Sequence, residues 1–261
     1  MIAIPRQLAA LAADAFLLAR FGPPGSDRPE GRAWERAASG LLLRPGLSRR
    51  QHAGVLGLFG RSSASGTRHE LDGAGEGFEA GVWLEAKARQ SLDKTDVATF
   101  LFKCLDLYAH AGHDDPTAVA SGRWWPVLVS SEPVSESVRR SCAGWGVVLC
   151  DPAVVPLVTL FDTASQPPAD MYLPEVRLSE LVRLAKRSVE PMQARWRIDT
   201  DRHELSMRLG RADPREIGDL LYLQDELTSD LLDAFDKHAP DYLSRRGLAL
   251  ADRMKAAAIS A

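Results

Sequence analysis

Apolar side chains recur every three or four positions in the first part of the chain. The pattern covers residues 4–20 and ends at the Gly and Pro cluster of residues 22–25. A second stripe starts after Asp27 or Glu30, carries apolar groups as far as Leu42, and stops at Pro45 and Gly46. We therefore expect two amphipathic helices near the N-terminus.

The next part of the chain alternates on a shorter period. Residues 48–66 are rich in Gly, Ser and Arg, and the apolar run at 55–59 within them fits a short helix or a strand equally well. Residues 67–72 and 81–88 read as two antiparallel strands. The glycine-rich run Gly73–Gly77 lies between them and predicts the turn of this hairpin.

Helix and strand patterns then alternate. Residues 93–109 return to helical spacing, with Ser91 or Asp93 available as the N-cap. Residues 125–130 form an apolar strand, Ser135 caps a helix that ends near Trp145, and residues 147–150 form a further strand. This order predicts an α/β fold, a mixed sheet flanked by helices.

The composition changes after Pro167 and Pro168, and the remaining pattern is helical. The best-defined helix covers residues 213–235, because Asp213, Pro214 and Glu216 form a typical N-terminus. Further helices are expected near 178–190 and 241–257. We therefore divide the chain into a domain at 1–170 and an α-helical C-terminal extension at 171–261.

The overall composition indicates an ordinary globular protein. With 45% hydrophobic and 26% charged residues, the chain is neither a disordered protein nor a collagen-like one. Its three cysteines (Cys104, Cys142 and Cys150) have no metal-binding spacing and are expected to be small buried groups in a reducing compartment. No apolar stretch reaches the ~20 residues that span a bilayer. Asp14 interrupts the first apolar run, so we expect no signal peptide, no membrane association and a cytoplasmic protein.

The net charge of −3 conceals an uneven distribution. Residues 1–69 hold ten Arg, no Lys and four acidic residues, whereas residues 70–110 hold eight acidic and four basic residues. A basic segment followed by an acidic one suits a surface that binds an anion beside a site that binds a cation. Ordinary scatter along a chain of this length explains the same counts.

The predicted hairpin carries the residues with the most specific chemistry. Asp72 follows its first strand, and Glu85-Ala86-Lys87 closes its second. The period of two places Glu85 and Lys87 on one face and Ala86 on the other. Two carboxylates and a backbone carbonyl are suitable oxygen ligands for a hard divalent cation. A neighbouring lysine can orient the attacking water and add positive charge beside a phosphate.

At these residues the sequence resembles the PD-(D/E)xK phosphodiesterase superfamily, which has a restriction-endonuclease-like fold. The match consists of Asp72 and Glu85-x-Lys87, with Leu71 in place of the proline of the motif. The resemblance covers residues 31–150, less than half of the chain. It implies a mixed sheet flanked by helices, with the acid and the E-x-K at the ends of adjacent strands.

The same resemblance implies a magnesium-dependent nuclease, most often a DNA endonuclease of restriction, defence or repair type. Asp72, Glu85 and the carbonyl of Ala86 would bind Mg²⁺ or Mn²⁺, and Lys87 would be the catalytic lysine. Glu35 lies on the first expected core helix, where many members carry an auxiliary glutamate. Arg32, Arg36, Arg68 and Arg89 are the candidate nucleic-acid contacts, in a wider basic set that also includes Arg49, Arg50, Arg61, Lys94 and Lys103.

Other polar groups near the motif have a simpler interpretation. Glu70 would share the face of Asp72 in a regular strand and assist the metal, or it is a solvated side chain. His69 is expected to be structural. Residues 110–115 contain two His and two Asp, which could suggest metal ligands, but the glycine-containing segment reads as a solvated loop after a helix.

Two alternatives to a nuclease stay open at this point. The first is a non-catalytic protein of the same fold that binds nucleic acid or a partner protein through its C-terminal helices, which could equally form a homodimer. The second is an unrelated α/β protein in which the motif occurs by chance. The choice between DNA and RNA is not determined by these residues.

Overall fold

The structure of the chain is a computed structural model. It describes residues 6–22, 31–42, 47–51, 54–56, 67–77, 81–88, 92–114 and 124–156, together with residues 215, 217–219, 221–222, 224–226 and 228–229 near the C-terminus.

Two helices open the described part of the chain, α1 (Arg6–Phe21) and α2 (Gly31–Gly40). The strands that follow are β1 (Leu47–Gln51), β2 (Gly54–Leu56), β3 (His69–Leu71), β4 (Gly73–Gly77) and β5 (Gly81–Lys87). Helix and strand then alternate as α3 (Lys94–Asp114), β6 (Trp124–Ser130), α5 (Glu136–Trp145) and β7 (Val148–Cys150). From α3 to β7 the predicted order of elements is confirmed.

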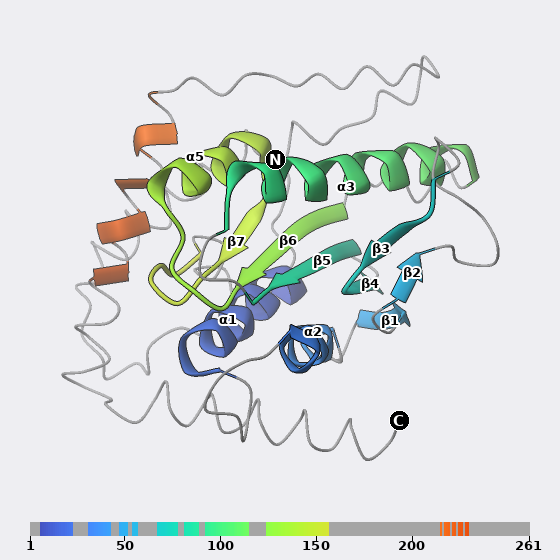
Figure 1. Cartoon of the computed structure of the whole chain (residues 1–261), viewed down its shortest axis with the longest axis horizontal. Coiled ribbons are helices and arrows are strands. Elements are labelled where there is room, and N and C mark those ends of the chain that lie inside the picture. Colours follow the sequence, from blue (N-terminus) through green and yellow to red (C-terminus); the bar gives the residue numbers. More distant parts are fainter. Residues whose placement is uncertain are drawn as a thin grey trace.

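Most of the strands form one mixed sheet. Within the described residues its order is β1-β4-β5-β6-β7. β1, β4 and β5 pair antiparallel, whereas β6 pairs parallel with β5, and β7 pairs parallel with β6. β2 and β3 form a separate antiparallel ribbon. The predicted α/β class, a mixed sheet flanked by helices, is therefore confirmed (Figure 1).

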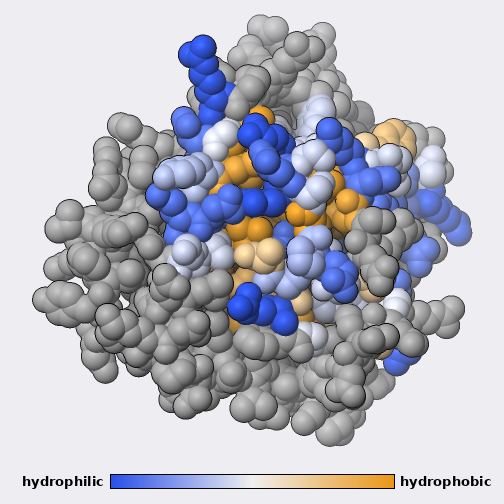
Figure 2. All heavy atoms as spheres, turned by 60° about the vertical axis from the view of Figure 1, so that its left-hand side comes forward, coloured by the Kyte–Doolittle hydropathy of each residue, from blue (hydrophilic) through white to orange (hydrophobic). Residues whose placement is uncertain are grey.

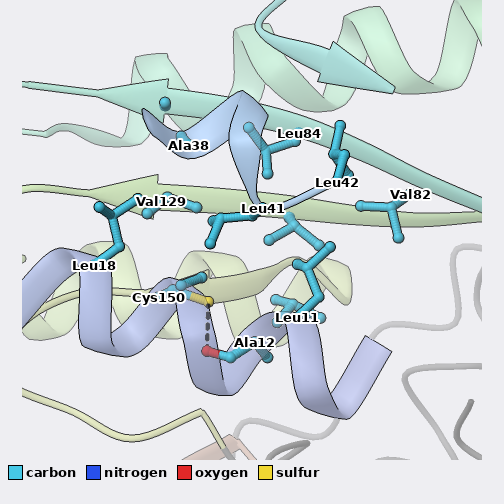
Figure 3. Packing of buried hydrophobic residues seen from close by; sticks show 14 of the residues in the cluster. Leu11, Ala12, Leu18, Ala38, Leu41, Leu42, Val82, Leu84, Val129 and Cys150 are labelled. Carbon is cyan, nitrogen blue, oxygen red and sulfur yellow. Dashed lines mark hydrogen bonds between the residues drawn. The ribbon is translucent and has the colours of Figure 1, made fainter. Parts of the chain in front are cut away.

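The helices cover both faces of this sheet (Figure 1). On one face α1 and α2 pack on alternate residues of β5, namely Val82, Leu84 and Ala86. Figure 3 shows this packing, including the Cys150 thiol, which donates to the carbonyl of Ala12 over 3.9 Å. On the other face α3 and α5 pack on Trp83 and on residues of β6 and β7. The core therefore has two apolar layers, one on each side of the sheet.

Local sequence signals account for the ends of two helices. Asp93 caps α3, because its Oδ1 accepts from the N–H groups of Thr95 and Asp96 over 2.7 and 2.9 Å. α5 ends at Gly146, whose φ of 74° is the left-handed conformation that glycine adopts without strain. Ser135 precedes α5 as predicted, but its hydroxyl makes no capping bond to the helix.

The prediction for the glycine-rich run is wrong. Gly73–Gly77 is strand β4, which pairs with both β1 and β5, and it is not a turn. The segment before it, β3, pairs with β2 and not with residues 81–88. The glycines have a packing role. A Cβ atom at position 73 would lie 2.6 Å from Cδ1 of Leu42, and one at position 75 would lie 3.2 Å from Cδ2 of the same side chain.

Two other segments are now assigned. The ambiguous region at 48–66 contributes β1 and β2, so part of it is extended. The run that begins at His110 is not a loop, because α3 continues through Gly112 to Asp114. The helix therefore extends past residue 109, where the predicted helix ends, and past Gly112.

The described residues between 215 and 229 are helical, in agreement with the predicted helix at 213–235. They contact α5 and the segment after β7: Arg139 Nη2 lies 2.7 Å from Asp225 Oδ1, and Thr228 Oγ1 accepts from the N–H of Val155 over 2.9 Å. Figure 2, turned so that the α5 side of Figure 1 comes forward, shows hydrophilic side chains around smaller apolar areas on this face. The helices expected at 178–190 and 241–257 lie outside the described residues.

The three cysteines are buried, as the sequence predicts, and all three are free thiols. Among the described residues no helix is both long enough and apolar enough to cross a membrane.

Candidate functional site

The alternation along β5 places charged and apolar groups on opposite faces of the sheet. Val82, Leu84 and Ala86 belong to the apolar layer under α1 and α2. Trp83 belongs to the layer under α3 and α5, and Glu85 shares its face. The Nζ of Lys87 lies 2.6 Å from Oε1 of Glu85, so these two side chains meet on that face. The predicted division of the E-x-K residues between the two faces is confirmed.

Asp72 joins the same cluster from the neighbouring strand. It lies between β3 and β4, and the pairing of Gly73 with Leu84 brings Asp72 opposite Glu85 one position further along. Its Oδ2 accepts from the backbone N–H of Ala86 over 2.7 Å. The Asp72 carboxylate thus continues the hydrogen bonding between β4 and β5 by one more bond, with a side chain in place of a backbone carbonyl.

Burial and neighbouring acids change the ionisation of Asp72. Burial raises its pKa from 3.8 to about 6, because a carboxylate loses hydration when it leaves water. The bond from the N–H of Ala86 lowers this pKa, and the carboxylates of Glu85 and Glu35 raise it. Lys87 lowers it. These effects put Glu35 and Lys87 within electrostatic range of Asp72.

Glu85 is the most enclosed acid of the site. Only 4% of the residue is exposed. Among the described residues two lysines contact its carboxylate: Lys87 at 2.6 Å, and Lys103 at 3.0 Å from Oε1 and 3.3 Å from Oε2. Charge-assisted hydrogen bonds of this kind are stronger than neutral ones and offset the free energy of burying a carboxylate.

Lys103 also belongs to the site, although the sequence indicates it only as one of several basic residues near the motif. It lies on α3 and also donates to the carbonyl of Glu70 over 2.9 Å. A usable signal was present in the helical pattern. Lys103 stands next to buried Cys104 and three residues after buried Phe100, so a lysine borders the apolar stripe of α3. A charge in such a place needs a partner across the interface.

Glu35 lies on α2 and is half-buried, and its effect on the pKa of Asp72 places it near the cluster. Glu70 has an exposed side chain, in agreement with the alternative of a solvated residue, and its backbone carbonyl makes the contact to Lys103. His69 is structural, as expected. Its Nε2 lies 2.6 Å from Oδ2 of Asp106 on α3, and its ring meets that of Phe102 edge to face.

The structure describes the side chains of two of the four predicted nucleic-acid contacts. The side chains of Arg36 on α2 and Arg68 before β3 are exposed. Arg32 belongs to α2, but its side chain and all of Arg89 lie outside the described residues. Their roles therefore stay predictions.

The donor chemistry at Asp72 and Glu85 fits a hard divalent cation such as Mg²⁺ or Mn²⁺, because both acids present oxygen ligands on adjacent strands. No cluster of three His, Cys, Asp or Glu side chains in the described residues is close enough to hold a metal ion. Mg²⁺ is commonly bound by one or two carboxylates and keeps several waters, so two acids are a sufficient protein contribution.

Comparisons of the chain with protein-family models, with curated proteins and with solved structures find no match.

Proposed function

We propose that the chain is a metal-dependent nuclease that hydrolyses phosphodiester bonds, with DNA cleaved internally as the expected reaction. One observation carries the proposal. The carboxylate of Asp72 binds the N–H of Ala86, the residue between Glu85 and Lys87, so the three charged groups of the motif lie together at the ends of two adjacent strands. An acid from one strand and an acid and a lysine from the next are the groups that phosphodiester hydrolysis with a metal requires.

Each residue of the cluster has a distinct role in this proposal. Asp72 and Glu85 would hold Mg²⁺ or Mn²⁺, with the carbonyl of Ala86 as a further ligand. Glu35 would be an auxiliary acid that acts on the site electrostatically and is not a third carboxylate ligand. The bound cation would supply Lewis-acid chemistry and offset the charge that develops on the phosphate. Lys87 would orient the attacking water through its ammonium protons and add positive charge beside the scissile phosphate.

The order of elements supports the restriction-endonuclease-like form of the proposal. The antiparallel run β1-β4-β5 is followed by α3 and by the parallel strand β6, and α2 with Glu35 precedes it. Asp72 directly precedes β4, and the E-x-K ends β5. This is the arrangement that the resemblance implies for the acid and the E-x-K.

A cleavage assay tests the catalytic proposal. We would incubate the wild type with supercoiled and linear double-stranded DNA, single-stranded DNA and RNA, with Mg²⁺ or Mn²⁺ and with EDTA. Lys87→Ala should lose cleavage, whereas Arg140→Ala, which removes an exposed positive charge on α5, should retain it. Equal residual activity in the wild type and Lys87→Ala, or no cleavage of any substrate, would refute the proposal for these substrates.

The contacts of Glu85 also support a second candidate, a non-catalytic protein of the same fold that binds nucleic acid or a partner protein. The two lysines already balance the charge of this carboxylate without a metal. A thermal titration with Mn²⁺ separates the candidates, since a ligand that binds only the folded state raises the melting temperature. Stabilisation in the wild type and its loss in Asp72→Asn supports the nuclease, and no stabilisation in either favours the second candidate.

A further inference from the structure

The carboxylate of Glu85 is shared by cations from two different elements. Lys87 comes from the same strand, and Lys103 comes from α3 across the sheet–helix interface. Both lysine side chains are about four-fifths buried, with 23% and 20% of their surface exposed. These pairs are therefore shielded from water and are stronger than ion pairs on an open surface.

A divalent cation at Glu85 would need the same oxygens. A carboxylate offers about four lone-pair directions. Lys87 and Lys103 already make three contacts to this carboxylate within 3.3 Å. An ammonium group at that distance also repels a cation bound to the same oxygen. Cation binding at Glu85 therefore requires at least one lysine to withdraw.

Lys103 is the lysine that can withdraw at the lower cost. Its contacts to Glu85, at 3.0 and 3.3 Å, are longer than the 2.6 Å contact of Lys87. It also keeps a second acceptor, the carbonyl of Glu70 at 2.9 Å, which holds the ammonium group when Glu85 is no longer its partner.

The position of that second acceptor is fixed by a neighbouring contact. His69, the residue before Glu70, pairs with Asp106 at 2.6 Å, and Asp106 lies three residues after Lys103 on the same helix. Residues three apart lie on one side of a helix. Both β3 contacts are therefore made to one side of α3, and the carbonyl of Glu70 stays beside Lys103 whichever partner the ammonium group has.

We infer that Lys103 is a positioning residue that occupies Glu85 in the absence of metal and competes with a divalent cation for this carboxylate. Lys103 keeps Glu85 oriented in the metal-free protein, and it moves fully to the carbonyl of Glu70 when the cation is bound. It thereby raises the concentration of divalent ion that the site requires. The inference rests on the proposed function, since it assumes that Glu85 is a metal ligand.

Calorimetric titration with Mn²⁺ tests the competition without an activity measurement. Lys103→Met removes the competing charge, so we expect the Kd for Mn²⁺ to fall by at least about fivefold, the effect of removing an exposed ion pair. Lys103→Arg keeps the charge and should bind Mn²⁺ like the wild type. Arg140→Met removes an exposed positive charge from α5, away from the site, and should also leave the Kd unchanged.

The outcomes separate this inference from the proposed function. A merely structural role for Lys103 predicts weaker Mn²⁺ binding in Lys103→Met, because Glu85 loses its support, and weaker or unchanged binding overturns the inference alone. A wild type that binds no Mn²⁺ overturns the metal site, and the inference with it. Lys103→Gln, checked for folding by circular dichroism, replaces the Met variant if the latter does not fold.

Discussion

The two faces of β5 differ although they belong to one seven-residue strand. Toward α1 and α2 the strand presents Val82, Leu84 and Ala86, and all three are enclosed in an apolar layer. Toward α3 it presents Trp83, followed by Glu85 and Lys87, and the apolar layer gives way to charged groups. Both faces are covered by helices, so the difference does not come from exposure to water.

The comparison indicates how the fold accommodates a costly site. A buried carboxylate lowers stability unless cations and hydrogen bonds compensate it. On the α3 face Lys87 and Lys103 supply the cations, and the N–H of Ala86 supplies the bond to Asp72. On the opposite face continuous apolar packing stabilises the same strand. Changes to the two faces should therefore have different consequences, for activity on one and for stability on the other.

The largest effect is expected on the charged face. Glu85→Gln keeps the shape of the side chain and removes its charge, so we expect cleavage to fall about 10³-fold, or ~4 kcal/mol of transition-state stabilisation. Single-turnover cleavage in Mg²⁺ measures the loss, and circular dichroism checks that the variant is folded. Glu136→Gln, on an exposed part of α5, is the control. Cleavage at the wild-type rate by Glu85→Gln would show that the charged face of β5 is not needed for activity.

Substitutions on the opposite face of β5 should lower the free energy of unfolding. Leu84 is fully buried, and Leu84→Ala leaves a cavity under α1 and α2, so we expect the free energy of unfolding to fall by about 3 kcal/mol. Urea unfolding measures this change. Thr99→Ala, on the exposed side of α3, should change stability by less than ~0.5 kcal/mol. The folded Leu84→Ala protein should still cleave, and loss of activity without loss of stability would contradict the assignment.

The raised pKa of Asp72 makes the stability of the fold depend on pH. Because burial raises its pKa from 3.8 to about 6, the folded state holds the proton more tightly than the unfolded state. The stability associated with this proton is fully present below pH ~4 and is lost as the pH rises through ~6. Asp72→Asn carries no charge, so at pH 8 without metal it should be more stable than the wild type by about 2 kcal/mol.

Urea unfolding at pH 4.5 and pH 8 tests the effect of Asp72, with a smaller difference between the two proteins expected at the lower pH. Asp219→Asn, at an exposed position, serves as the control and should show no such pH dependence. A wild type that is more stable than Asp72→Asn at pH 8 would show that its carboxylate stabilises the fold, opposite to the direction expected here.

The smallest effect concerns the strand beside the site. Gly73→Ala would place a methyl group 2.6 Å from Leu42 Cδ1, so we expect a loss of about 1 kcal/mol as that buried side chain shifts. The double variant with Leu42→Ala should lose less stability than the sum of the single variants. Thermal or urea unfolding of the four proteins gives the coupling. Additive losses would mean that contact with Leu42 is not the reason why a side chain at position 73 lowers stability.

The local parts of the site could be predicted from the sequence. The face shared by Glu85 and Lys87 follows from the strand period alone, and Asp93 follows from the preference of helix N-caps for Asp. The prediction failed where distant packing decides the structure. A Gly-Ala-Gly-Glu-Gly run lacks the β-branched and aromatic residues typical of strands, and it became β4 because Leu42, in the turn after α2, packs against it.

Two features of the site depended on contacts between segments that are distant in the sequence. Lys103 and Glu85 are 18 positions apart in the sequence, and they meet only because α3 docks on this face of the sheet. Asp72 was expected at the end of a strand paired with residues 81–88, and it lies instead at the junction of β3 and β4. It still meets the E-x-K, since the position before Gly73 stands opposite Glu85. The register of β4 and β5 therefore brings Asp72 to the E-x-K, although the predicted pairing of residues 67–72 with residues 81–88 is wrong.

The bond between Ala86 and Asp72 gives the molecule a built-in spectroscopic reporter. The amide proton of Ala86 is donated to a carboxylate that titrates near pH 6, so its NMR frequency should follow the protonation of Asp72. Its exchange with deuterium should be slower while that carboxylate is charged, because a charge-assisted bond is harder to open. A single labelled alanine therefore allows the state of the site to be observed without substrate and without cleavage.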